Sequence, residues 1–184
     1  MREEFVNTEF STCKYMMDTN CMSHIALIKG LLPRMIERKQ GGQIVNILTV
    51  SALMGVAVRT MYCASKAAMD GFTKALRVEA GMHNIKVTAI YPYYVQTNIS
   101  KNAASGSGEA FGKVDSNINK GMPVDKAANM ILKAIYHERD EIVVGKFHIW
   151  LAPRLCFLSS TIDNIVGTLK AKSQHKVMAA AKKE

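Results

Sequence analysis

The chain of 184 residues has little of what marks fibrous, disulfide-linked or disordered proteins. Twelve Gly and four Pro are too few for a collagen-like or low-complexity chain. No uncharged apolar run reaches the roughly 18 residues that a membrane-spanning helix needs. The cysteines form no Cys-x-x-Cys pair and no cluster with histidine, so we expect no disulfide framework, no metal site and a reducing, intracellular compartment. They are Cys13, Cys21, Cys63 and Cys156.

What remains is a chain with 48% apolar and 21% charged residues, the composition of one globular domain. Its net charge of +9 is concentrated toward one end, because 170–184 carries five lysines and a single glutamate. This tail is either a solvated basic end or a contact with an anionic surface such as a membrane. No aromatic residues alternate with these lysines to stack on bases, so no nucleic-acid partner is expected.

Hydrophobic periodicity predicts helices that alternate with short β-branched runs typical of buried parallel strands. The predicted helices cover 17–38, 61–82 and 125–138, and the predicted strands cover 43–49, 85–91 and 141–144. This alternation indicates an α/β fold whose parallel sheet is covered on both faces. Ligands of such sheets bind at the carboxyl ends of the strands, which directs attention to 49–60, 91–119 and the residues after 144.

The clearest chemical pattern is Tyr62-Cys63-Ala64-Ser65-Lys66. Tyr62 and Lys66 are four residues apart, so on a helix they share one face. An ammonium group near a phenol favours the phenolate, so Tyr62 could act as a general acid or base near neutral pH. The same spacing also fits a surface tyrosine packed against the stem of a lysine.

Further segments set this pair in a context. They are 44–50, Gly55, 62–68, 87–92 and Thr97-Asn98-Ile99. Together they resemble the short-chain dehydrogenase/reductase family over most of the chain, up to about Gly145. Within it, 97–103 and 121–124 are most similar to the subfamily of members 7 and 7B. The resemblance implies a Rossmann-like, doubly wound parallel sheet that is truncated at its N-terminal side.

The resemblance also implies roles for individual residues. Tyr62 matches the catalytic acid/base, and Lys66 matches the lysine that lowers its pKa and holds the nicotinamide ribose. Thr49 matches a serine whose hydroxyl binds the substrate oxygen, with Ser51 as a nearby competitor that is two residues away from the usual spacing. Asn20 matches an asparagine that interrupts a helix and holds a water in a proton relay with the lysine.

The nicotinamide side of the expected site follows the second strand. Thr97 matches the threonine that binds the nicotinamide carboxamide, and Pro92 and Val95 match the lining of that pocket. The chain departs from the family at Tyr93, where a glycine usually follows the proline. A bulky side chain there must point away or reshape the pocket.

The glycine-rich turn that holds the cofactor's pyrophosphate in this family has no counterpart in the sequence. The glycines of 106–112 follow no predicted strand and are interpreted as part of a loop over 102–119, which occupies the place of the family's substrate lid. We therefore expect NADP or NAD as cofactor, without a residue that decides between them.

These features divide the chain into three parts. Residues 1–147 form the C-terminal part of the dehydrogenase domain, 148–169 an apolar helical region that either packs on the domain or lies in a membrane interface, and 170–184 the basic tail. The expected function is hydride transfer between nicotinamide and a small-molecule carbonyl or secondary alcohol, of lipid, steroid or retinoid character. The alternative is a catalytically silent binding or membrane-associated protein. The resemblance also implies a homodimer and an association with the endoplasmic reticulum membrane.

Overall fold

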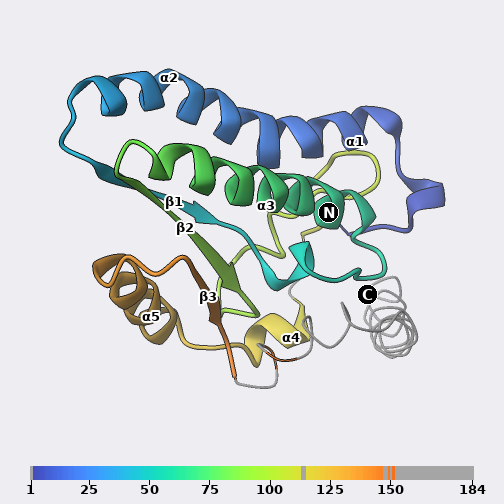
Figure 1. Ribbon diagram of the computed structural model, residues 1–184. Helices are drawn as coiled ribbons and strands as arrows, with labels where there is room; N and C mark the ends of the chain where they lie inside the picture. Colours follow the sequence, from blue (N-terminus) through green and yellow to red (C-terminus); the bar gives the residue numbers. More distant parts are fainter. Residues whose placement is uncertain (1, 113–114, 147–148, 150, 152–184) are drawn as a thin grey trace.

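The computed structural model describes residues 2–112, 115–146, 149 and 151. Its centre is a parallel three-stranded sheet in the order β1-β2-β3 (Figure 1). The strands are β1 (Gly42–Ile47), β2 (Ile85–Pro92) and β3 (Glu141–Val144). Gly42 lies opposite Ile85, and Ala89 lies opposite Glu141, so β3 begins about halfway along β2.

A long helical segment precedes β1. After a 3-10 turn at Phe5–Asn7, α1 (Phe10–Met17) continues through a π-helical turn (Asp18–Met22) into α2 (Ser23–Glu37). The sequence predicted only 17–38, because α1 leaves large apolar side chains such as Phe10 and Tyr15 exposed and therefore has no clear periodicity.

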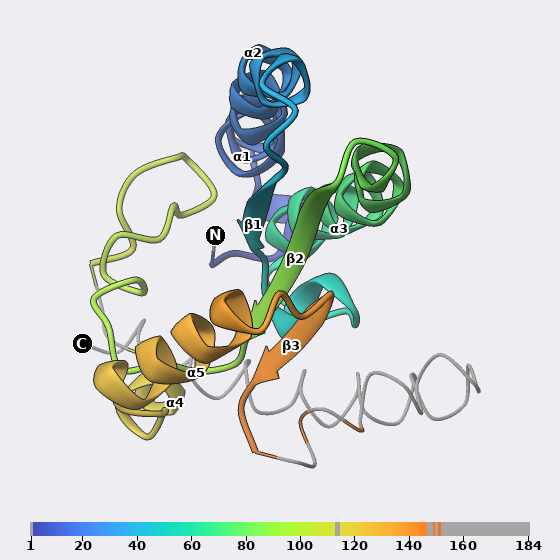
Figure 2. The ribbon, with the colours of Figure 1, turned by 60° about the vertical axis from the view of Figure 1, so that its left-hand side comes forward.

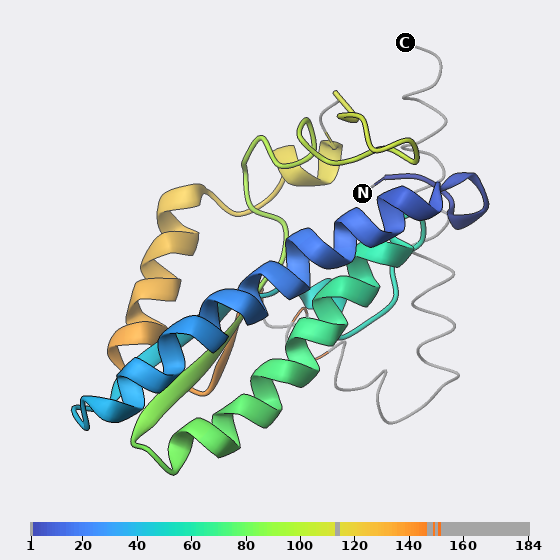
Figure 3. The same ribbon diagram turned by 90° about the horizontal axis from the view of Figure 1, so that it is seen from above.

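α3 (Thr60–Gly81) connects β1 to β2 and covers one face of the sheet together with α2 (Figure 2). Seen from above, α2 and α3 run side by side (Figure 3). Buried α3 residues recur at intervals of three and four, as an amphipathic helix requires. They are Met69, Thr73, Leu76 and Ala80, and they contribute to a core that contains Ile85, Val87, Ala89 and Tyr91 of β2.

The opposite face of the sheet is covered by α5 (Val124–Tyr136) (Figure 2). Ala127 and Ala134 of this helix pack with Ile90 of β2 and Val144 of β3. Because helices cover both faces of a parallel sheet, the predicted α/β architecture is confirmed. No helix among the described residues combines the length and the apolarity of a transmembrane segment.

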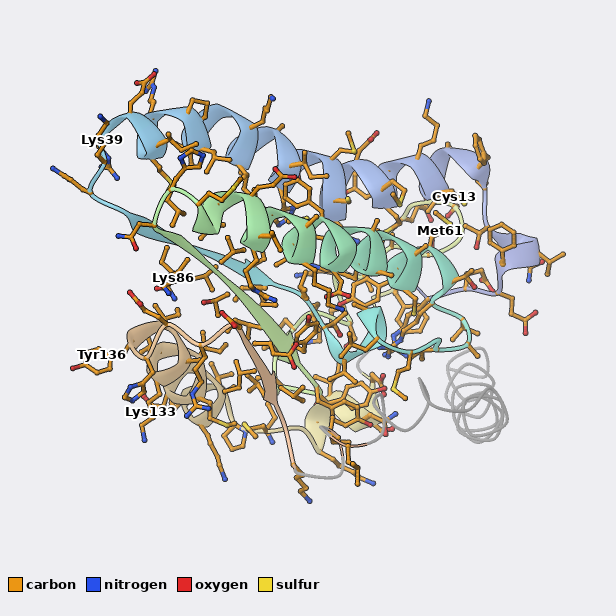
Figure 4. The ribbon with its side chains drawn as sticks, viewed as in Figure 1. Cys13, Lys39, Met61, Lys86, Lys133 and Tyr136 are labelled. Carbon is orange, nitrogen blue, oxygen red and sulfur yellow. The ribbon has the colours of Figure 1, made fainter. Side chains whose placement is uncertain are left out.

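The carboxyl ends of the strands lie at the end of the molecule where Met61 is seen, whereas Lys39 and Lys86 mark the opposite end (Figure 4). The predicted strand 43–49 ends earlier, at Ile47, because Thr49 turns the chain into a 3-10 turn at Val50–Ala52. After β2, the expected loop contains one short helix, α4 (Ser116–Asn119).

Candidate active site

A cavity of about 480 Å³ opens at the carboxyl ends of β1 and β2. Every residue that the resemblance singled out lines it, although these residues come from α2's preceding π-helical turn, both strand ends and α3. They are Asn20, Thr49, Ser51, Tyr62, Lys66, Pro92, Val95 and Thr97. The fold therefore gathers the predicted set at one place.

Tyr62 lies in the first turns of α3, and its side chain forms a hydrogen bond with that of Thr49. Thr49 is 9% exposed and caps the 3-10 turn by accepting a hydrogen bond from Ser51 N over 3.3 Å. The competing Ser51 thus contributes a backbone amide to the position of Thr49. Of the two hydroxyl residues, Thr49 is the one bonded to Tyr62.

The electrostatics of Tyr62 differ from the expectation that Lys66 lowers its pKa. Burial raises the pKa of Tyr62, and the rise is opposed by the hydrogen bond from Thr49 and by the charge of Arg59. Lys66 instead donates a hydrogen bond from Nζ to the carbonyl of Ile47 over 3.2 Å. Burial lowers the pKa of Lys66, against the influence of Cys21. The expectation was wrong because burial of the phenol dominates and Arg59 is the cation that acts on it.

Asn20 lies in the π-helical turn, where the resemblance expects a helix-interrupting asparagine. Its Nδ2 donates to Ser65 Oγ over 3.1 Å, and Ser65 Oγ donates to the carbonyl of Tyr62 over 2.9 Å. Ser65 is completely buried. This chain of bonds connects the π-helical turn to the part of α3 that carries Tyr62 and Lys66.

The other side of the cavity is formed by the end of β2 and the loop that follows. Pro92 and Val95 are partly buried, and the side chain of Thr97 is exposed. Tyr93, in place of the usual glycine, is 37% exposed and packs edge-on against Tyr94, with ring centroids 4.5 Å apart. The bulky residue is accommodated at the rim and does not fill the cavity.

Three charged residues near the cavity were missed by the sequence analysis. The carboxylate of Asp115, which is completely buried, accepts hydrogen bonds from the guanidinium groups of Arg2 and Arg59. Both arginines line the cavity. No local pattern could reveal this cluster, because Asp115 lies 113 residues from Arg2 and 56 residues from Arg59.

The sequence profile of the family described as short chain dehydrogenase matches residues 1–108, more than half of the chain. The chain belongs to the short-chain dehydrogenase/reductase family. It is 34% identical over 176 residues to dehydrogenase/reductase SDR family member 7B of Xenopus tropicalis, covering 96% of this chain and 57% of that protein. It is also 34% identical to the SDR family protein 7-like of Drosophila melanogaster, over 100% of this chain and 55% of that protein. The predicted similarity to members 7 and 7B is confirmed.

The chain thus spans about half the length of the curated relatives it matches. Among solved structures of the family's fold, the apo form of LigO from Sphingobium sp. strain SYK-6 superposes with a TM-score of 0.69 at 21% identity, over 100% of this chain and 62% of that chain. A short chain dehydrogenase from Burkholderia cenocepacia, solved in complex with NADP, has a TM-score of 0.63 at 22% identity, over 80% of this chain and 56% of that one. These likenesses confirm the Rossmann-like fold.

Proposed function

We propose that this chain carries the catalytic half of an NAD(P)-dependent oxidoreductase that transfers hydride between nicotinamide and a carbonyl or secondary alcohol. The observation that carries the proposal is the hydrogen bond between Tyr62 and Thr49 inside the cavity, with Lys66 one helical turn beyond Tyr62. A phenol, a hydroxyl and an ammonium group then surround the position of one substrate oxygen.

The raised pKa of Tyr62 suits the reduction of a carbonyl. Because the phenol is protonated at neutral pH, it can give its proton to the alkoxide that forms when hydride reaches the carbonyl carbon. Thr49 offers a second donor to the same oxygen, and its own position is fixed by Ser51 N. In alcohol oxidation the proton moves the opposite way, from the alcohol to the phenolate of Tyr62.

The residues around the cavity fit the nicotinamide half of the cofactor. Pro92 and Val95 give one side an apolar wall, Thr97 presents an exposed hydroxyl, and Lys66 supplies an ammonium group next to Tyr62. When bound, the cofactor supplies the hydride chemistry. NADP and NAD are both supported, since related structures are described as complexes with NADP and with NADH.

An apolar substrate body fits the rest of the cavity. Its wall on the β1 side is formed by apolar side chains of the strand end and the following loop, which are Leu48, Val50, Met54 and Val56. Such a wall favours a lipid-like, steroid or retinoid carbonyl compound over a sugar.

The decisive experiment replaces the proposed acid/base. Tyr62→Phe in the full chain is expected to abolish NAD(P)H-dependent turnover of carbonyl substrates while leaving the melting temperature within a few degrees of wild type. Tyr15→Phe on the exposed surface of α1 is the matched control and should keep full activity. Equal turnover in Tyr62→Phe and wild type would exclude the proposal, and a chain without any turnover that still binds ligands would favour the catalytically silent alternative.

Two further expectations stay proposals. Exposed apolar residues one helical turn apart on α2 (Leu27 and Leu31) and on α3 (Val78 and Met82) support a homodimer through these helices, which light scattering of the purified chain can test. The expected contact with the endoplasmic reticulum membrane involves 148–184, which lies outside the described residues except for Ile149 and Leu151. Co-sedimentation with anionic vesicles tests that contact.

A further inference from the structure

The charge of the cavity lining is one-sided. Among the described residues that line it, Arg2, Arg59 and Lys66 are cationic, and no aspartate or glutamate is present. Lys66 follows Tyr62 by one helical turn, whereas Arg59 precedes it, immediately before α3 begins. The two cations are therefore separated along the helix by about 10 Å. Lys66 serves the nicotinamide side of the proposed site, which leaves the positive charge at the Arg59 end without an assigned role.

The cluster at this end contains two guanidinium groups and one carboxylate. Asp115 Oδ2 accepts from Arg59 Nη2 over 3.1 Å and also from Arg2 Nη2. The second oxygen of Asp115 accepts from the backbone amide of Asn117 over 2.8 Å and so caps α4. One carboxylate thus neutralises only one of two nearly buried cations, whose side chains are 3% and 12% exposed. The pKa of Arg2 is lowered by burial and by the like charge of Arg59.

Arg59 also has a donor that is not used. Its Nε is buried and has no hydrogen-bond partner among the described residues. A buried donor without an acceptor is costly, and more so when it belongs to a charged group. The rest of the side chain is held in place, because the guanidinium lies over the ring of Tyr94, with Cζ 5.6 Å from the ring centroid. A planar, fixed guanidinium is well suited to bind a carboxylate or a phosphate.

The backbone next to Arg59 supports a fixed orientation. Val58 has a φ of 57°, a left-handed conformation that is rare for a β-branched residue, and its carbonyl accepts from Glu3 N over 3.1 Å. Such strain persists only where the surrounding structure enforces it, and it occurs mainly at functional sites. Arg59 therefore faces the cavity in a conformation that the fold maintains.

We propose that Arg59, together with Arg2, binds an anionic group of the substrate, so that the carbonyl compound reduced at Tyr62 carries a carboxylate or a phosphate. This inference rests on the proposed function for the place of the reacting carbonyl. It combines with the apolar wall of the cavity into an amphiphilic substrate, with an apolar body, a carbonyl at Tyr62 and an oxyanion at Arg59.

The test is a binding comparison that needs no turnover. Three probes share one aromatic ketone, namely 4-acetylbenzoate, 4-acetylphenyl phosphate and the uncharged 4-acetylbenzamide. Calorimetric titration of the full chain is expected to give at least tenfold tighter binding for one or both anionic probes than for the amide, and the ratio between the two anions identifies the preferred group. Equal affinity for all three probes would overturn the proposal.

Variants then locate the anion. Arg59→Gln should remove the tenfold preference, and Arg34→Gln, an exposed arginine on α2, should leave it unchanged. Asp115→Asn should increase anion affinity, because it frees both guanidinium groups while asparagine still caps α4. A purely structural cluster would instead show no gain in Asp115→Asn. Arg59→Lys, with the charge kept and the planar fork lost, gives an intermediate affinity and serves if Arg59→Gln does not fold.

Two outcomes separate this inference from the proposed function. Anion binding without any turnover would leave the inference standing and count against the enzyme. Turnover of neutral ketones with no preference for anions would do the reverse. Displacement of the anionic probes by NADPH would assign the arginines to the cofactor's phosphates and overturn the inference.

Discussion

Asn20 of the π-helical turn and Ser65 of α3 are joined by a hydrogen bond of 3.1 Å between Nδ2 and Oγ. Ser65 is completely buried, and its own donor is directed at the carbonyl of Tyr62. The bond therefore links two helical segments that are 45 residues apart in the sequence at the level of the proposed catalytic residues.

A double-mutant cycle measures this link. Asn20→Ala, Ser65→Ala and the double variant are expected to show a coupling free energy of about 1 kcal/mol in urea denaturation, since each single change removes the same hydrogen bond. Strictly additive free energies of unfolding would mean that the bond contributes nothing to stability.

The pH dependence of turnover tests the electrostatics of Tyr62. Alcohol oxidation requires the phenolate, and burial raises the pKa of Tyr62, so the rate should still be increasing near the ordinary tyrosine pKa of about 10. Removing the positive charge in Arg59→Gln raises this pKa further and shifts the alkaline limb to higher pH. The Arg34→Gln profile should overlay that of wild type. A limb that moves to lower pH in Arg59→Gln would contradict the assigned influence of Arg59.

Tyr91 provides a test of alkaline stability. Its hydroxyl donates to Asp70 Oδ1 over 2.6 Å inside the core, and burial together with this carboxylate raises the pKa of Tyr91 far above the ordinary value. The unfolded chain therefore releases this proton at lower pH than the folded chain, and the free energy of unfolding should fall as pH rises above about 10. Tyr91→Phe removes that contribution to the decline.

At neutral pH the same variant should be about 1.5 kcal/mol less stable than wild type, since a hydrogen bond to a charged acceptor is lost while Asp70 keeps its ion pair with Lys74. Tyr15→Phe on the exposed surface is the control for both measurements. An unchanged pH dependence of unfolding in Tyr91→Phe would show that Tyr91 is not the group responsible.

Two glycines are predicted to respond to alanine in opposite directions. Gly41 has a φ of 68°, and a Cβ there would lie 2.7 Å from the backbone oxygen of Asn84, so Gly41→Ala should destabilise the fold by 1 kcal/mol or more, roughly. Gly71 lies within α3 with no atom near its Cβ position, so Gly71→Ala should stabilise the fold by about 0.5–1 kcal/mol. Thermal denaturation of both variants checks the contrast, and a stabilised Gly41→Ala would refute the clash.

The sequence was most informative where one local pattern determines one structure. β3 was predicted over its exact range, because Ile142, Val143 and Val144 form a β-branched run directly after a helix end. The convergence of Thr49, Tyr62 and Thr97 on one cavity followed from the rule that ligands bind at the carboxyl ends of parallel strands.

Features that depend on distant contacts could not be predicted. The cluster of Arg2, Arg59 and Asp115 forms only when the start of the chain, the approach to α3 and the loop after β2 meet. The raised pKa of Tyr62 was missed for a related reason, since burial depends on the packing of the whole cavity and not on the spacing to Lys66.

The π-helical turn at Asp18–Met22 has a consequence for chain length. A π-helical turn corresponds to one residue inserted into an α-helix, and each helical residue advances the side-chain direction by about 100°. Deleting one exposed residue there, such as Thr19, would restore a continuous α-helix and rotate α1 by that angle relative to α2. Cys13 and Met16, now buried against the domain, would then turn toward water. At this position the number of residues, more than their chemistry, determines which face of α1 is buried.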